Sequence, residues 1–166
     1  KLLAEGSNFS VPSFETPRGI PTLPLREEDL TFIDQVEHSP HLFQRMIRKK
    51  YDLRITVVGH KVFSLRIDSQ TGSGDLDWRN DYTVNMEPFA LPADIESKCI
   101  NLTRRLGLNY GAIDLILTDE GDYRFLEINC AGQYLWIELR TELQISREIA
   151  LLLTGKCEPL FTSGSH

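Results

Sequence analysis

Alternating and continuous runs of apolar residues predict two β-hairpins in this chain. In the first, residues 53–58 and 61–67 are rich in β-branched residues and flank a Gly-His turn. In the second, residues 110–118 and 123–129 flank an Asp-Glu-Gly-Asp turn, and both strands are apolar enough to be buried. We therefore expect antiparallel pairing to dominate the sheet.

Three further segments have the apolar spacing of helices. Residues 27–37 begin with acidic side chains, which favour the positive end of a helix. Residues 93–106 stop at Gly107, and residues 139–153 stop at Gly155, because glycine readily ends a helix. The apolar positions that define the three helices are Leu30, Ile33 and Val36, then Ile95, Cys99, Leu102 and Leu106, then Leu143, Ile149 and Leu153.

The rest of the chain is less regular. Residues 1–26 are rich in Gly, Pro and Ser, which is typical of a loop that is either functional or partly disordered. Residues 42–47 form a mostly apolar run that we interpret as a buried strand, and residues 68–90 have a polar, glycine-containing middle. Helices and antiparallel strands follow one another along the chain, so the predicted fold class is α+β.

The composition is typical of a soluble globular protein. The 166 residues, 41% hydrophobic and 25% charged, suffice for one ordinary domain or two small lobes. A net charge of -6 argues against a nucleic-acid partner, which would require a basic face. No apolar run has the length of a membrane span. The three widely spaced cysteines indicate reduced thiols in a cytoplasmic protein.

Two carboxylates interrupt the apolar strands of the second hairpin. Asp114 and Glu127 each occupy the middle of a strand, where a charge is costly unless it is paired or bound to a cation. Glu127 and Asn129 share a face, and we expect Asp114 opposite Glu127. Three oxygen donors would then converge, which suits Mg²⁺. The alternatives are salt bridges from buried arginines to the two acids, and a strand-end turn at Asn129.

Arg54 and Arg66 lie on adjacent strands of the first hairpin, with Arg66 on the face opposite to Leu65. A guanidinium binds phosphate oxygens in a planar fork, so both residues suit a phosphoryl group. The alternative is an exposed ladder of ion pairs, which the charge pattern favours for Arg54 and leaves open for Arg66. Asp52 lies two residues before Arg54 and could receive a ribose hydroxyl.

Five short motifs together resemble the ATP-grasp ligases. The Asp-Leu-Arg strand at residues 52–54 and the Leu-Glu-Ile-Asn strand at residues 126–129 are similar to ATP-grasp ligases in general. Three pieces resemble the branch that crosslinks ribosomally made peptides, the microviridin or graspetide group. They are Ser69-Gln70, Asp77-Trp78-Arg79 and Ala131-Gly132-Gln133.

The resemblance covers roughly residues 40–153 and implies a partial ATP-grasp fold. Residues 1–47 would be part of the central (lid) lobe with a flexible glycine-rich loop, and residues 48–160 the carboxy-terminal lobe. Residues 161–166 would be a tail of the kind left by an expression tag. Since the sequence opens at Lys1 without a methionine, we expect it to be a fragment.

The resemblance also implies a site for ATP and Mg²⁺. The metal ligands would be Asp114, Glu127 and Asn129. The catalytic residues would be Arg66, which stabilises the transferring phosphoryl group, and Arg54, which positions phosphate or acyl phosphate. The residues expected to contact the nucleotide are Lys1, Gln44, Arg45, Met46, Ile47 and Asp52.

Two positions depart from the family pattern. Residues 43–47 would be a hinge whose backbone reads the adenine edge, and relatives often have an acid after Gln44, where this chain has Arg45. Relatives often have Pro after the metal-binding Asn, where this chain has Cys130. The first difference puts the usual contact with the adenine amino group in doubt, whereas Pro is mainly a backbone device.

The activity implied by the resemblance is ATP-dependent ligation. A side-chain carboxylate of a precursor peptide would attack the γ-phosphate of ATP, and a hydroxyl or amine of that peptide would displace phosphate to form an ester or amide. The alternatives are a ligase for small-molecule or protein-tail carboxylates, and a non-catalytic nucleotide- or peptide-binding module. Leu135 and Trp136 would form either a substrate wall or the contact of a homodimer.

Overall fold

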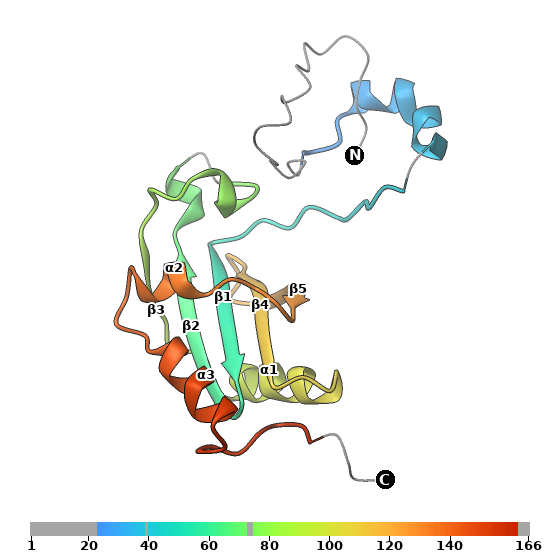
Figure 1. The fold of residues 1–166 in the computed structure, drawn as a ribbon. Helices are drawn as coiled ribbons and strands as arrows, with labels where there is room; N and C mark the ends of the chain where they lie inside the picture. Colours follow the sequence, from blue (N-terminus) through green and yellow to red (C-terminus); the bar gives the residue numbers. More distant parts are fainter. Residues whose placement is uncertain (1–22, 39, 73–74, 163–166) are drawn as a thin grey trace, which may run out of the picture. The chain divides into compact units, whose positions relative to one another are not determined.

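The computed structural model describes residues 23–38, 40–72 and 75–162 (Figure 1). The chain divides into two units, Lys1–Ile47 and Arg48–His166, and each is described by itself. Within the described ranges, no helix has both the length and the apolar character that a membrane span requires.

The first unit contains a 3-10 helix, η1, at Glu27–His38. The helix predicted from the apolar spacing is therefore present in a tighter form. Leu30, Ile33 and Val36 recur every three residues, and a 3-10 helix aligns residues at that spacing in one row. Leu30 and Ile33 remain 49% and 42% exposed.

The buried strand predicted at residues 42–47 is wrong. These residues are not in a strand, and Leu42 and Met46 are 80% and 67% exposed. A strand requires a partner for its backbone hydrogen bonds, and none of the described strands pairs with this segment. The glycine loop expected around residues 6–8 lies outside the described residues.

The second unit is built on a five-stranded antiparallel sheet with the order β3-β2-β1-β4-β5 (Figure 1). Both predicted hairpins are confirmed, and Gly59, with a φ of 53°, makes the tight turn of the first. The sequence did not predict β3, which pairs with β2. The strands are β1 (Tyr51–Val58), β2 (Lys61–Ile67), β3 (Met86–Pro88), β4 (Tyr110–Leu117) and β5 (Tyr123–Asn129).

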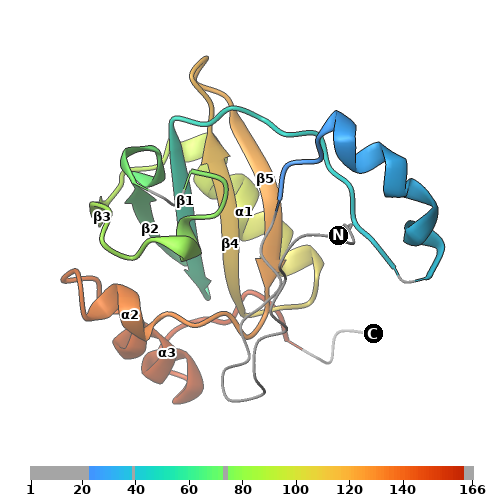
Figure 2. The same ribbon diagram turned by 90° about the horizontal axis from the view of Figure 1, so that it is seen from above.

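Helices cover both faces of this sheet. Figure 2 shows α1 on one side, which we call the α1 face, and α2 and α3 on the other, which we call the α2/α3 face. Two short 3-10 helices, η2 and η3, lie between β2 and β3 in the sequence. The bounds are Ala93–Arg105 for α1, Leu135–Glu138 for α2, Ile145–Leu153 for α3, Ser69–Thr71 for η2 and Trp78–Asn80 for η3.

The single helix predicted at residues 139–153 is wrong in extent, because α2 and α3 are separated by a turn. Glu138 at the end of α2 accepts a hydrogen bond from the backbone N–H of Ser146, at 2.5 Å. This bond satisfies one of the free donors at the start of α3, so the helix begins there. Leu153, expected in the core, is 81% exposed.

Each face of the sheet has its own apolar core. On the α1 face, Leu53 and Ile113 pack with Cys99 of α1, and on the α2/α3 face, Leu65 packs with Ile137 and Ile145. Leu106, expected on the buried stripe of α1, lies just past the helix and is 52% exposed.

β5 is the edge strand, and its predicted burial is wrong. Phe125 and Leu126 are 53% and 43% exposed, whereas every residue of β4 from Gly111 to Ile116 is buried. A central strand is covered by neighbours on both sides, but β5 pairs only with β4 in the described sheet. The alternation of apolar residues therefore identified a strand correctly without revealing its place in the sheet.

Candidate functional site

The strand register brings the predicted metal ligands to one face. Asp114 is paired with Arg54 on one side and with Glu127 on the other, and Ala112 is paired with Asn129. Directly paired residues share a face of an antiparallel sheet, and so do residues two apart in a strand. Asp114, Glu127 and Asn129 therefore all lie on the α2/α3 face, as the hairpin predicted.

Asp114 is buried between two arginines. Arg54 Nη1 donates to Asp114 Oδ1 at 2.6 Å, and Arg79 Nη2 donates to Oδ2 at 2.7 Å. Arg54 and Asp114 are only 6% and 4% exposed. The charge pattern had favoured an exposed ion-pair ladder for Arg54, and that interpretation is wrong. The structure instead shows the other alternative, a buried arginine that is paired with Asp114.

Glu127 lies in a different environment from Asp114. Its side chain is 57% exposed, and its Oε1 accepts from the same Arg79 Nη2 at 3.1 Å. We had expected both carboxylates to be buried and therefore to need a positive partner. This expectation holds for Asp114 and is wrong for Glu127. Asn129 is also exposed, and its Oδ1 accepts the backbone N–H of Ala131 at 2.9 Å, as in a strand-end turn.

Arg79 is the site residue that the sequence analysis missed, although its Asp-Trp-Arg motif contributed to the resemblance. Asp77 Oδ1 accepts from the Arg79 backbone N–H at 3.1 Å and from Nη1 at 3.3 Å. Burial by itself lowers the pKa of Arg79, but Asp114, Asp77 and Glu127 together raise that pKa above its usual range. The guanidinium contacts strands far away in the sequence, so no local pattern could have identified it.

The loop after β5 closes over Arg54. Gln133 contributes its backbone carbonyl to Arg54 Nη2 at 3.5 Å, and the Gly132 carbonyl accepts a hydrogen bond from the Tyr110 hydroxyl. Gly132 is buried, and a Cβ added there would overlap the Cβ of Ala112. The Ala-Gly-Gln motif is therefore required in part by close approach of this loop to β4.

Asp52 extends the charged row along the α2/α3 face, two residues from Arg54. It is 4% exposed and accepts from Lys49 Nζ at 2.7 Å and from Ser69 Oγ at 2.5 Å. Burial raises the pKa of the Asp52 carboxyl more than the contacts with Lys49 and Ser69 lower it. Lys49 and Ser69 are further residues of this row to which the sequence analysis had assigned no contact.

Arg66 is separated from Arg54 by the sheet. It is paired with Leu53 in the register, so it lies on the α1 face. Its guanidinium contacts Asp68 and Glu87, both at 3.0 Å, and lies 4.4 Å from the centre of the Tyr51 ring. The structure therefore does not bring the two predicted catalytic arginines together.

The other residues predicted to contact the nucleotide lie outside the second unit, which carries the charged row. Gln44, Arg45, Met46 and Ile47 belong to the first unit, and Lys1 lies outside the described residues. Their roles remain predictions.

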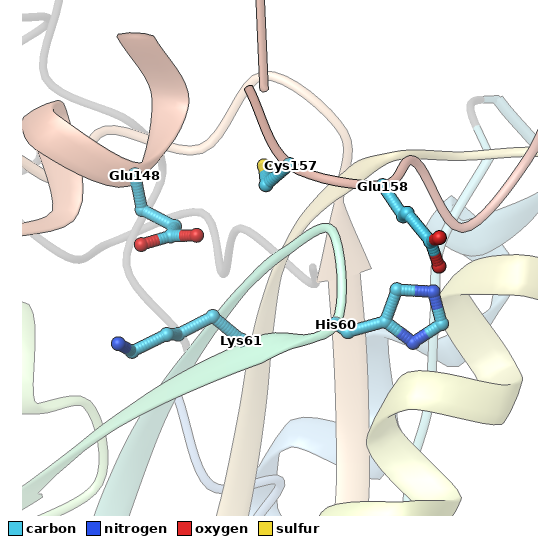
Figure 3. Close-up of a pocket in the computed structure, with 5 residues that line it drawn as sticks. All are labelled: His60, Lys61, Glu148, Cys157 and Glu158. Atoms are coloured by element: carbon cyan, nitrogen blue, oxygen red, sulfur yellow. The ribbon is translucent and has the colours of Figure 1, made fainter. Parts of the chain in front are cut away.

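A separate pocket lies at the other end of β1 (Figure 3). Its lining is His60, Lys61, Glu148, Cys157 and Glu158. In the close-up, Lys61 extends toward Glu148 and His60 toward Glu158, so the pocket contains groups of opposite charge. Burial and the neighbouring Glu148 raise the pKa of the Cys157 thiol, which disfavours the reactive thiolate. None of the predicted site residues lines this pocket.

A cation fits between Asp114 and Glu127, because one nitrogen of Arg79 already lies within 2.7 and 3.1 Å of their oxygens. Two carboxylates and the amide oxygen of Asn129 are also the hard donors that Mg²⁺ prefers. Within the described residues no three His, Cys, Asp or Glu side chains gather into a metal site. Asn129 would have to be the third protein donor, and its Oδ1 accepts from the Ala131 N–H in this structure.

No protein-family model matches the chain, and a search of curated proteins finds no match. Solved structures do match. One is an ATP-grasp ligase from Chryseobacterium gregarium, described as RiPP-associated and in complex with ADP and a leader and core peptide. It has 39% identity and a TM-score of 0.79, over 85% of this chain and 44% of that one.

A second match is the macrocyclase MdnC from Microcystis aeruginosa MRC, bound with precursor peptide MdnA. It has 37% identity and a TM-score of 0.71, over 83% of this chain and 41% of that one. The ATP-grasp ligase PsnB, at 22% identity and a TM-score of 0.69, shares the fold. This chain spans less than half the length of each. Its fold is therefore the partial ATP-grasp fold, and its resemblance to the ligases that modify ribosomally made peptides is confirmed.

Proposed function

We propose that this chain is the carboxy-terminal part of an ATP-dependent ligase that crosslinks a precursor peptide. A side-chain carboxylate of the peptide attacks the γ-phosphate of ATP and forms an acyl phosphate and ADP. A hydroxyl or amine of the same peptide then displaces phosphate and forms an ester or amide. The observation that carries this proposal is the facing pair Asp114 and Glu127, with a cationic group held between them.

The metal in this proposal is Mg²⁺ bound with ATP. Asp114, Glu127 and Asn129 would hold it, and it would supply positive charge that offsets the charge on the phosphate oxygens. Asp52 would receive a ribose hydroxyl, because it lies on the same face as Asp114. Residues 44–47 would contact adenine through their backbone, and Lys1 would contact the phosphates.

The two arginines take different parts in the proposal. Arg54 is buried against Asp114, so we assign it the positioning of that carboxylate in addition to a phosphate. Arg66 would stabilise the transferring phosphoryl group only after leaving Asp68 and Glu87. Arg66 lies on the α1 face, across the sheet from Asp114, so its place in the proposal rests on the family resemblance and not on the site geometry.

The peptide substrate is supported by two matches above 30% identity. The Chryseobacterium gregarium ligase was solved with a leader and core peptide, and MdnC with its precursor peptide. The long apolar side chains at Leu135 and Trp136 lie shortly after β5 and would contact such a peptide. A homodimer contact at the same residues is the alternative use of that surface.

The test is turnover of ATP by the whole protein with a synthetic peptide rich in Thr, Ser, Asp and Glu. Ring formation lowers the peptide mass by one water per bond, and one ADP is released for each bond formed. Asp114→Asn combined with Glu127→Gln should lower turnover well over tenfold, because it removes both negative charges facing the metal. Asp122→Asn, an exposed carboxylate on the same hairpin that pairs with Arg124, is the matched control and should keep its turnover. Unchanged ATP consumption in the double variant contradicts the proposal.

A non-catalytic nucleotide-binding module is the second candidate, because Arg45 stands in the predicted hinge where relatives often have an acid. Calorimetry with Mg-ATP and peptide separates the two functions. Binding of both without any release of ADP from ATP favours the module. A small-molecule ligase would instead consume ATP with a free amino acid as acceptor and leave the peptide mass unchanged.

A further inference from the structure

Arg79 places a single nitrogen between two carboxylates from facing strands. Its Nη2 lies 2.7 Å from Asp114 Oδ2 and 3.1 Å from Glu127 Oε1. We infer that Arg79 is an internal cation that holds these carboxylates together and is exchanged for the divalent metal when nucleotide binds. This inference rests on the proposed function, since it takes Asp114 and Glu127 as the metal ligands.

Electrostatic repulsion explains why such a group is needed. Like charges directly opposite each other in an antiparallel pair destabilise the sheet, and Asp114 is directly opposite Glu127. Arg54 offsets the charge of Asp114 but makes no described contact with Glu127. Arg79 is thus the guanidinium that, among the described contacts, bridges the two strands.

The two arginines differ in how easily each can leave. The Arg54 side chain is 7% exposed and lies beneath the loop after β5, whereas the Arg79 side chain is 42% exposed. Arg79 also has a third carboxylate partner, Asp77, at 3.3 Å. Arg54 is therefore a fixed partner of Asp114, and Arg79 can turn toward solvent without leaving an unpaired buried charge.

The backbone that carries Arg79 is anchored while its guanidinium moves. The preceding residue, Trp78, is 5% exposed and packs against Trp136 and Tyr82, with ring centres 5.1 and 5.7 Å away. Because Trp78 fixes η3 on the α2/α3 face, the exchange is a change of side-chain rotamer rather than movement of a loop. The local concentration of the guanidinium near the carboxylates stays high, so it competes with the metal.

The competition predicts that removal of Arg79 strengthens metal binding. We propose to measure Mn²⁺ binding by electron paramagnetic resonance on the whole chain, with wild type, Arg79→Gln and Arg79→Lys. Arg79→Gln should bind Mn²⁺ at least about tenfold more tightly, since the charge-assisted hydrogen bonds of Arg79 no longer compete with the metal for the carboxylates. Arg79→Lys keeps the charge without the forked donors and should fall between the two.

A second readout is thermal unfolding. Without metal, Arg79→Gln should melt at a lower temperature than wild type, because Asp114 and Glu127 then repel. Mn²⁺ should raise the melting temperature of Arg79→Gln more than that of wild type. Arg124→Gln is the matched control, because Arg124 lies on the same hairpin and pairs with the exposed Asp122 instead of Asp114 or Glu127, and it should change neither quantity.

The outcomes separate the inference from the proposed function. Equal Mn²⁺ affinity in wild type and Arg79→Gln, together with lost binding in Asp114→Asn, would overturn the inference alone. Weaker binding in Arg79→Gln would also overturn it. Mn²⁺ that binds no variant, or binds Asp114→Asn as tightly as wild type, would overturn the proposed metal site and this inference together.

Discussion

β4 and β5 form one hairpin and carry facing carboxylates, but their positions in the sheet make those carboxylates different. The Asp114 side chain on the inner strand β4 is 6% exposed and contacts two arginines. The Glu127 side chain on the edge strand is 57% exposed and shares one arginine. A carboxylate is therefore buried in the core on β4 and exposed at the surface on β5.

Asp114 is therefore a structural charge as well as a proposed metal ligand. Asp114 is needed to neutralise buried Arg54 before any nucleotide arrives, whereas Glu127 can be altered with little effect on the fold. Loss of function at Asp114 would therefore mix two effects, and loss of function at Glu127 would report on the site alone.

The largest expected effect is on stability when Asp114 is removed. Asp114→Ala leaves Arg54 buried without its carboxylate and should lower the free energy of unfolding by about 3–5 kcal/mol. Glu127→Ala, the matched change on the edge strand, should cost less than about 1 kcal/mol, because its ion pair is exposed. Urea denaturation of both variants measures the difference. Equal losses would contradict the contrast between the two strands.

A smaller effect is expected where the loop after β5 packs on β4. Gly132→Ala places a Cβ against Ala112 and should lower the free energy of unfolding by about 1–3 kcal/mol. Ala112→Gly in the same protein makes room for that Cβ, so the double variant should lose less than the sum of the single variants. Additive losses in this cycle would show that the two positions do not touch.

The smallest effect is a pH dependence at Asp52, at the start of the charged row. Burial raises the pKa of Asp52 above 3.8 in the folded protein, so the folded state binds its proton more tightly than the unfolded state. The stability that Asp52 contributes is therefore present at pH below 3.8 and falls as the pH rises through the higher folded pKa. Asp52→Asn removes this titration.

The measurement is the difference in unfolding free energy between wild type and Asp52→Asn across mildly acidic pH. That difference should shift in favour of Asp52→Asn as the pH increases. A shift in the opposite direction would mean that Lys49 and Ser69 outweigh burial and lower the pKa of Asp52 instead.

Local pattern predicted the strands of the second unit well, because side-chain alternation and turn residues are properties of neighbouring positions. Both hairpins and α1 were found with bounds close to those observed. The apolar run at residues 42–47 failed for the same reason that β5 was misjudged. Apolar character does not state whether a partner strand or helix covers the segment.

The sequence by itself determined which residues could face one another. A spacing of two in β5 and a short turn put Glu127 and Asn129 on the face of Asp114, and the motifs identified an ATP-grasp resemblance. Only the tertiary structure decided the partners of those residues. Arg54 forms a buried ion pair with Asp114, Arg66 lies on the α1 face, and Arg79 reaches Asp114 from η3. The contacts of Arg54 and Arg79 with Asp114 join residues 60 and 35 positions apart, which no local periodicity encodes.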